Sequence, residues 1–272
     1  MDNTVKEPLI HLSKREDMSF GKKWLVRIIA ILLSLIVCAG FIFIIIKMNP
    51  VEVYEGIVEG AVGTGRRFWV TARDALTLLC VAVAVTPAFK MKFWNIGAEG
   101  QILMGCVASA AMMIYAGNAL PTGLLLVLMF VCSFIAGGIW GIIPAFFKAR
   151  WNTNETLFTL MLNYVAMQVV TFCIVYWENP AGSNSVGIIN APTRAGWFPQ
   201  LFGLDYGWNL AIVLLLTVLM FIYMKRTKHG YEIAVVGESE NTARYAGINV
   251  GKVIVRTVGI SGGIAGIAGF IL

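Results

Sequence analysis

Apolar residues occur in long blocks along the chain, and shorter polar segments separate them. Seven of these blocks have about 20 mostly apolar residues, which is the length that a helix needs to cross the hydrocarbon core of a bilayer. The blocks cover residues 24–46, 69–88, 96–116, 121–143, 156–177, 208–224 and 253–272. The pattern predicts an all-α, polytopic transmembrane bundle of about seven spans.

Composition supports this interpretation. The chain of 272 residues is 58% hydrophobic and only 13% charged, whereas soluble domains carry roughly 25% charged residues. A soluble globular protein is therefore excluded. The first apolar block is longer than the ~7–15 residues of a signal peptide core and no small-residue cleavage site follows it, so we expect a retained helix.

The placement of Lys and Arg predicts the orientation. With the N-terminus inside, fifteen of the 21 basic residues lie in inner segments and five in outer segments, with Arg256 in the last span. Cytoplasmic segments carry such an excess. We expect a cytoplasmic tail at 1–23 and a transmembrane domain at 24–272, with an outer loop at 178–207 and an inner loop at 225–252.

Residues 47–68 are an outer segment with an unusual charge pattern. Glu52, Glu55 and Glu59 recur at spacings of three and four, which places them on one face of a helix. We expect an amphipathic helix on the outer membrane surface.

Several kinds of chemistry are absent from the sequence. No G-x-x-x-x-G-K-[ST] phosphate loop occurs, so any ATP must be hydrolysed by another subunit. With only His11 and His229 available, we expect no metal site and no cofactor. Ser261 lies in a G-x-S-x-G string, but no His lies in any span to serve as its base, so we expect no catalytic residue.

Glycine pairs four residues apart favour close helix packing. Gly137 with Gly141 and Gly259 with Gly263 have this spacing, as does the pair Gly262 and Gly266. We expect these residues to lie between helices.

The segment 93–101 places polar residues at membrane depth. Asn95, Glu99 and Gln101 occur together with two glycines at the start of the third span. Polar groups there are costly unless they face a cavity or another helix. If the segment is helical, Asn95 and Glu99 share one face. A solvated interfacial turn is the alternative.

The segment 152–164 starts the fifth span. Asn154 is a suitable helix N-cap, and Thr156, Thr159 and Asn163 follow on one stripe. The stripe indicates either a pathway lining or hydrogen bonds between helices.

The segment 234–248 lies in the inner loop. It predicts one short helix that is acidic at its start and ends at Gly247. Such a helix either inserts into a partner's groove, with Arg244 and Tyr245 as anchors, or is a solvated connector.

These three segments carry a resemblance to a known family. The strings N-I-G-A-E-G-Q, N-E-T-L…T-L-M-L-N-Y and A-R-Y-A-G-I occur in that order. The chain resembles, over about residues 69–272, the permease subunits of bacterial ABC importers in the branched-chain amino acid, ribose and nucleoside superfamily, most closely the nucleoside branch. Ser239-Glu240 replaces the family's usual Asn-Pro, and Thr242 its usual Ala.

The resemblance implies an importer in the bacterial inner membrane, with purine nucleosides as the favoured substrate. Its other parts are a second permease chain, an ATP-binding cassette subunit and an external substrate-binding lipoprotein. It implies two sets of site residues: for the pathway Asn95, Glu99, Gln101, Thr159 and Asn163; for ATPase coupling Glu238, Arg244, Tyr245 and Gly247.

Two alternatives to a nucleoside permease remain, and the sequence also suggests how far the protein extends. A pentose or vitamin permease of the same superfamily shares every motif, whereas an intramembrane serine hydrolase needs a base for Ser261. Family members continue through more helices after the seventh span, and Leu272 ends that span without a polar anchor. We therefore expect the chain to be part of a longer protein.

Overall fold

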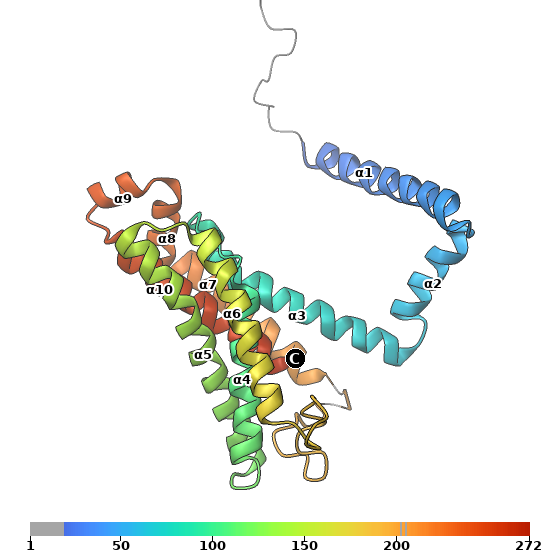
Figure 1. Ribbon diagram of the computed structural model, residues 1–272. Helices are drawn as coiled ribbons and strands as arrows, with labels where there is room; N and C mark the ends of the chain where they lie inside the picture. Colours follow the sequence, from blue (N-terminus) through green and yellow to red (C-terminus); the bar gives the residue numbers. More distant parts are fainter. Residues whose placement is uncertain (1–18, 202, 205) are drawn as a thin grey trace, which may run out of the picture. The chain divides into compact units, whose positions relative to one another are not determined.

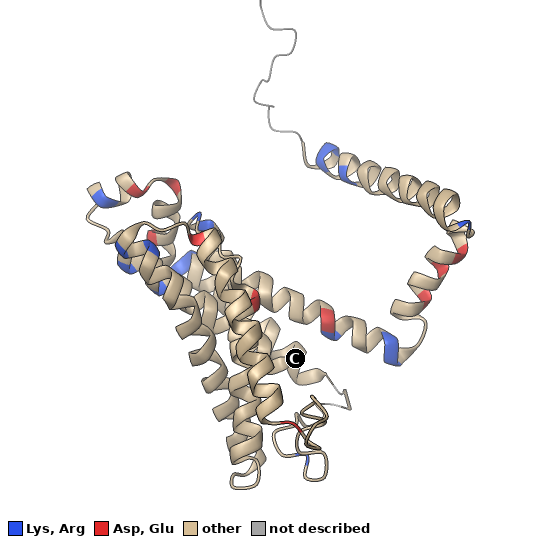
Figure 2. Ribbon diagram, viewed as in Figure 1, with Lys and Arg blue, Asp and Glu red and all other residues tan. Residues whose placement is uncertain are grey.

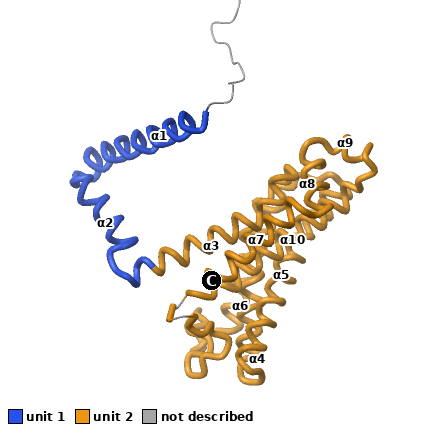
Figure 3. The backbone as a smooth tube through the Cα atoms, turned by 180° about the vertical axis from the view of Figure 1, so that it is seen from behind, with its two compact units in different colours: residues 1–68 blue, residues 69–272 orange. Residues whose placement is uncertain are grey.

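The computed structural model describes residues 19–201, 203–204 and 206–272. Contacts divide the chain into two compact units, one ending at Phe68 and the other covering Trp69–Leu272 (Figure 3). Seven helices among the described residues are long and apolar enough to cross a membrane, which confirms the predicted all-α fold and its seven spans. Most of the predicted tail 1–23, including His11, lies outside the described residues.

The first unit contains a long apolar helix and a shorter acidic one. Helix α1 (Phe20–Phe41) continues into a single π-helical turn, Ile42–Ile46, and α2 (Pro50–Val62) follows. Asn49 caps α2 by accepting a hydrogen bond from the Val51 N–H at 3.1 Å, and the Tyr54 hydroxyl donates to the Leu35 carbonyl of α1 at 2.6 Å. The three glutamates predicted to share a helix face lie in α2, and all are exposed.

The second unit is a bundle of helices around α10 (Figure 1). Helix α3 (Gly65–Lys90) leads into it. The bundle continues with α4 (Ala98–Ala116), α5 (Thr122–Trp151), α6 (Glu155–Tyr176), α7 (Gly207–Arg226), α8 (Lys228–Glu238), α9 (Glu240–Tyr245) and α10 (Val250–Ile271).

Helix α10 forms the centre of this bundle because its side chains are small. It packs mainly against α5 and α4, and α4 also packs against α6. Every residue from Ser261 to Ile271 is buried, and seven of these eleven are Gly, Ala or Ser. Small side chains allow helix backbones to approach closely, which is how helices associate where lipid supplies little hydrophobic driving force.

Charged residues concentrate at one end of the bundle. Figure 2 shows them on α8, on α9 and at the neighbouring ends of α5 and α10, whereas the middle parts of α4, α5, α6 and α7 are free of charge. This distribution is the one that a bilayer requires, because charges inside the hydrocarbon region are costly.

The connection between α6 and α7 is held against the bundle by polar side chains. The Asn190 amide donates to the Met113 carbonyl of α4 at 2.8 Å and to the Ala195 carbonyl at 3.1 Å. The Trp197 indole donates to the Ile189 carbonyl at 3.0 Å. Most of this predicted outer loop, residues 178–207, is therefore a folded cap, with positions 202 and 205 outside the described residues.

Candidate functional site

The turn before α4 is built around a pair of buried amides. Asn95 and Gln101 are 2% and 1% exposed, and each side chain donates to the other, at 3.2 and 3.3 Å. The Asn95 oxygen also accepts the Gly97 N–H at 3.1 Å. Buried amides are stable only when they are paired in this way. Helix α4 begins at Ala98, so Asn95 lies in the turn before it. Asn95 and Glu99 therefore do not share a helical face.

Helix α6 holds the first turn of α4 through Asn163. The Asn163 oxygen accepts the Gly100 N–H at 2.9 Å, and its nitrogen donates to the Ile96 carbonyl at 3.0 Å. The first N–H groups of any helix have no partner within the helix. Asn163 therefore caps α4 from a neighbouring helix.

Thr159 lies one turn before Asn163 on α6 and supports the same contact. Its hydroxyl donates to the Glu155 carbonyl at 2.7 Å, and its Cβ is so close to Gly97 that a Cβ added there would lie only 3.0 Å away. The Asn154 cap of α6 is confirmed, because its side chain accepts the Leu157 N–H at 3.2 Å. Four of the predicted pathway residues are thus buried around the start of α4. Thr159 and Asn163 contact it from α6, whereas Asn95 pairs with Gln101, which lies beside α5.

Glu99 differs from these four residues. It is in the first turn of α4 and its side chain is exposed. A carboxylate at this position is favoured by the positive end of the α4 dipole. The α4–α6 contact thus fixes the backbone of a helix turn that presents one accessible carboxylate.

The predicted packing glycines lie between α5 and α10. The backbones meet where Gly137 and Gly141 face Gly262 and Gly266, and a Cβ built on Gly262 would be 2.5 Å from the Gly137 carbonyl oxygen. The other predicted pair packs against α5 side chains instead, Gly259 against Ile142 and Gly263 against Phe134.

The inner-loop segment forms two helices instead of the predicted one. Helix α8 ends at Glu238 and α9 starts at Glu240, because Ser239 is extended and its hydroxyl accepts the Thr242 N–H at 3.3 Å. The prediction of a single helix over this segment is therefore wrong: Ser239 is a helix cap, and such residues favour helix starts over helix interiors. Gly247 closes α9 with a φ of +76°, a conformation that suits glycine.

Helix α9 projects two of the predicted coupling side chains outward. Tyr245 is 93% exposed, and Arg244 is exposed with a loose ion pair to Glu240 at 3.7 Å. Glu238, at the end of α8, is exposed as well. A tyrosine and an arginine side by side on a short, exposed helix are residue types that dominate binding energy at protein interfaces.

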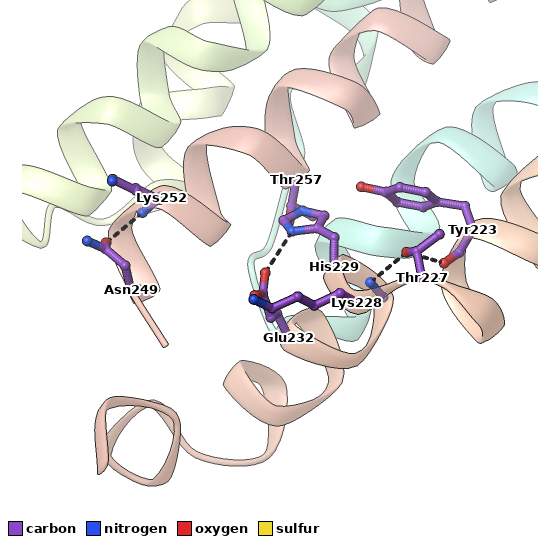
Figure 4. A network of polar contacts seen from close by, with 9 residues as sticks. Tyr223, Thr227, Lys228, His229, Glu232, Asn249, Lys252 and Thr257 are labelled. Carbon is purple, nitrogen blue, oxygen red and sulfur yellow. Dashed lines mark hydrogen bonds and ion pairs between the residues drawn. The ribbon is translucent and has the colours of Figure 1, made fainter. Parts of the chain in front are cut away.

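A buried histidine joins α8 to α10 (Figure 4). His229 is 4% exposed. Its Nδ1 lies 3.2 Å from a Glu232 carboxylate oxygen and its Nε2 lies 3.1 Å from the Thr257 hydroxyl of α10. Burial lowers the pKa of His229 below its ordinary value, and Arg256 acts in the same direction while Glu232 opposes it. The folded protein thus favours the neutral imidazole.

Gly237 is a second point at which the inner loop packs against the bundle. Gly237 of α8 contacts the Lys90 carbonyl at the end of α3 so closely that no Cβ fits. Together with the His229 contact, this packing fastens α8 to the bundle and leaves α9 exposed. Sequence reasoning missed the role of His229, because its partner Thr257 is 28 residues away and no local pattern connects the two.

Among the described residues, Ser261 has none of the surroundings that a hydrolytic site needs. It is fully buried, and its hydroxyl has no hydrogen-bond partner among the described residues. His229, the one histidine among the described residues, contacts Thr257 instead. A nucleophilic serine needs a base within hydrogen-bond reach and access for substrate.

Comparison with known proteins agrees with the fold. Residues 69–272 match the family described as the branched-chain amino acid transport system, permease component. A guanosine ABC transporter permease of Bacillus subtilis is 30% identical over 90% of this chain and 70% of its own length. A nucleoside ABC transporter permease of Lactococcus lactis is 28% identical over 92% of this chain and 70% of its own length. No solved structure gives a significant match.

The family match covers the whole second unit, and the relatives are transport subunits of ABC transporters. With seven apolar helices among the described residues, the chain is a multi-pass protein of the bacterial inner membrane and a transport component without an ATPase site of its own. The resemblance found in the three sequence segments is confirmed. The chain belongs to the family of permease components of branched-chain amino acid transport systems.

Proposed function

We propose that this chain is the permease subunit of an ABC importer that carries nucleosides, with purine nucleosides as the favoured substrates. The observation that carries the proposal is the relation to a guanosine permease over 90% of the chain. The three motifs that resemble the nucleoside branch agree with it, and they fall on the α4 start, the α6 start and the α8–α9 segment.

The pathway is proposed to pass the start of α4. Glu99 is the accessible polar side chain there, and it accepts hydrogen bonds from the hydroxyl groups of a passing solute. This turn is held in place by the buried side chains of Asn95, Gln101, Thr159 and Asn163. A charge within a span is costly and so indicates function.

The α8–α9 segment is proposed to be the docking site of the ATPase. Membership in the family implies association with an ATP-binding subunit and a substrate-binding protein. Arg244 and Tyr245 are the anchors, with Glu238 and the Gly247 turn shaping the contact. The His229 and Gly237 contacts transmit motion of α8 to α10 and α3. A second permease chain and an external lipoprotein complete the importer, with the N-terminus and α8–α9 in the cytoplasm.

Uptake of labelled guanosine tests the substrate. Cells with and without this chain are compared, in the presence of unlabelled purine nucleosides, pyrimidine nucleosides, free bases or ribose. We expect uptake to need the chain and to be blocked by nucleosides but not by ribose. Uptake that persists without the chain contradicts the proposal.

A sugar or vitamin permease is the second candidate. A glucose ABC transporter permease of Haloferax volcanii is 27% identical over 87% of this chain, and a probable riboflavin import permease of Treponema pallidum is 26% identical over 71%. Competition of the labelled uptake by a sugar or by riboflavin instead of nucleosides would favour this candidate and leave the permease architecture intact.

A further inference from the structure

A long apolar groove runs between α5 and α10. Its volume is about 860 Å³. Ile135, Ile139 and Ile142 of α5 line it and are 50%, 57% and 40% exposed. The groove is therefore open on the side of the bundle, where a spanning protein meets lipid.

One end of this groove is basic. Arg150 in the last turn of α5 lines it together with Lys252 and Arg256 of α10, and all three are exposed. Within the described part of the chain, none of the three forms an ion pair. This end lies with the charged residues that Figure 2 shows beside α8 and α9.

The charges at this end of the groove favour an added anion. Helix α10 has no acidic residue in its first turn and carries Lys252 there, at the positive end of the helix dipole. Lys252 and Arg256 are also four residues apart, so two like charges are neighbours on one helix face. Arg150 adds a third positive charge across the groove. Three cations that form no ion pair with a described residue, at the rim of an apolar groove, match an anion that carries an apolar tail.

The length of the groove fits a lipid chain. Phe134 and Arg150, the first and last residues of α5 that line it, are separated by a helical rise of about 24 Å at ~1.5 Å per residue. One leaflet of the hydrocarbon core measures about 15 Å. An acyl chain thus fits beside the isoleucines while its headgroup reaches the basic end.

We propose that this groove binds an anionic phospholipid. Its phosphate group is held by Arg150, Lys252 and Arg256, and one acyl chain lies between α5 and α10. Basic pockets between membrane helices have this specificity for anionic headgroups. The site is separate from the Glu99 turn, and it does not depend on which solute is carried.

Native mass spectrometry of the detergent-solubilised full chain tests the proposal. The chain is mixed with phosphatidylglycerol or phosphatidylcholine of identical acyl chains. We expect one phosphatidylglycerol to be retained and phosphatidylcholine to be lost. Replacing both α10 cations, Lys252→Gln with Arg256→Gln, weakens retention about 30-fold, the equivalent of ~2 kcal/mol at ~1 kcal/mol for each cation.

Matched variants separate this site from general charge effects. Lys225→Gln with Arg226→Gln removes two exposed cations at the end of α7 and leaves retention unchanged. Arg150→Gln alone, at an exposed helix end, lowers retention about fivefold, or ~1 kcal/mol. Ile139→Trp fills the apolar part and lowers retention of the lipid without removing any charge.

Four outcomes overturn the proposal. Two concern the lipid: phosphatidylcholine is retained as well as phosphatidylglycerol, or inorganic phosphate alone displaces the lipid. The third is that the α7 control weakens retention as much as the α10 double variant. The fourth is that a second copy of the chain occupies the groove, seen as a cross-link at position 139. Helical circular dichroism of each variant verifies that the bundle is folded, so a loss of retention is assigned to the groove.

Discussion

Replacing Asn163 with leucine tests how the α4 turn is held. The substitution removes two hydrogen bonds, one to the Gly100 N–H at 2.9 Å and one to the Ile96 carbonyl at 3.0 Å. Leucine fills a similar volume, so the main loss is polar. Hydrogen bonds between membrane helices contribute about 0.6 kcal/mol on average and up to about 1.7 kcal/mol. Losing two bonds therefore lowers the free energy of unfolding by about 1–3 kcal/mol.

The assay is unfolding of the full chain in mixed micelles with increasing denaturing detergent. Gln168→Leu is the matched control, because Gln168 is an exposed amide on the same helix, and exposed substitutions change stability by less than about 0.5 kcal/mol. Asn163→Leu should also reduce uptake, because the turn that carries Glu99 loses its cap. If the two variants unfold at the same detergent concentration, the capping role of Asn163 is refuted.

Three further predictions follow from the described contacts. Gly137→Ala places a methyl group against the Gly262 backbone and lowers the free energy of unfolding by about 1–3 kcal/mol. Gly123→Ala, which has open space around it, does not lower it. Thermal unfolding measures both variants. Because burial lowers the pKa of His229, the stability that its neutral form contributes is present above about pH 6.5 and is lost as the pH falls below that value. His229→Gln should flatten this dependence in unfolding experiments at pH 5.5 and 8. Arg244→Glu should leave membrane insertion intact and abolish uptake driven by ATP; substrate-stimulated ATPase turnover equal to that of the unchanged chain would contradict the coupling role.

The helices were predictable because their signals are local. A run of about 20 apolar residues identifies a span from its own composition, and Asn154 identifies a helix start from its own side chain. The boundary between α8 and α9 was missed because Ser239 caps α9 inside an otherwise continuous helical pattern. Sequence alone favoured continuity there.

The site was predictable in its residues but not in their arrangement. Polar side chains at membrane depth marked Asn95, Glu99 and Asn163, yet the same signal accompanies a pathway lining and a buried contact. The structure separates them, because Asn95 and Asn163 are buried in hydrogen bonds whereas Glu99 is exposed. Which glycine meets which also depends on the register of α5 against α10, which involves residues more than a hundred positions apart.

ATP-dependent uptake by proteoliposomes shows whether this chain carries nucleosides. The complete importer, assembled with this chain, is compared with the same preparation lacking it, and accumulation of labelled guanosine is followed after ATP is supplied on the side of α8 and α9. We expect accumulation that requires ATP and this chain and that falls sharply with Glu99→Ala. Accumulation of guanosine without this chain, or accumulation of a sugar but no nucleoside with it, would contradict nucleoside transport by this chain.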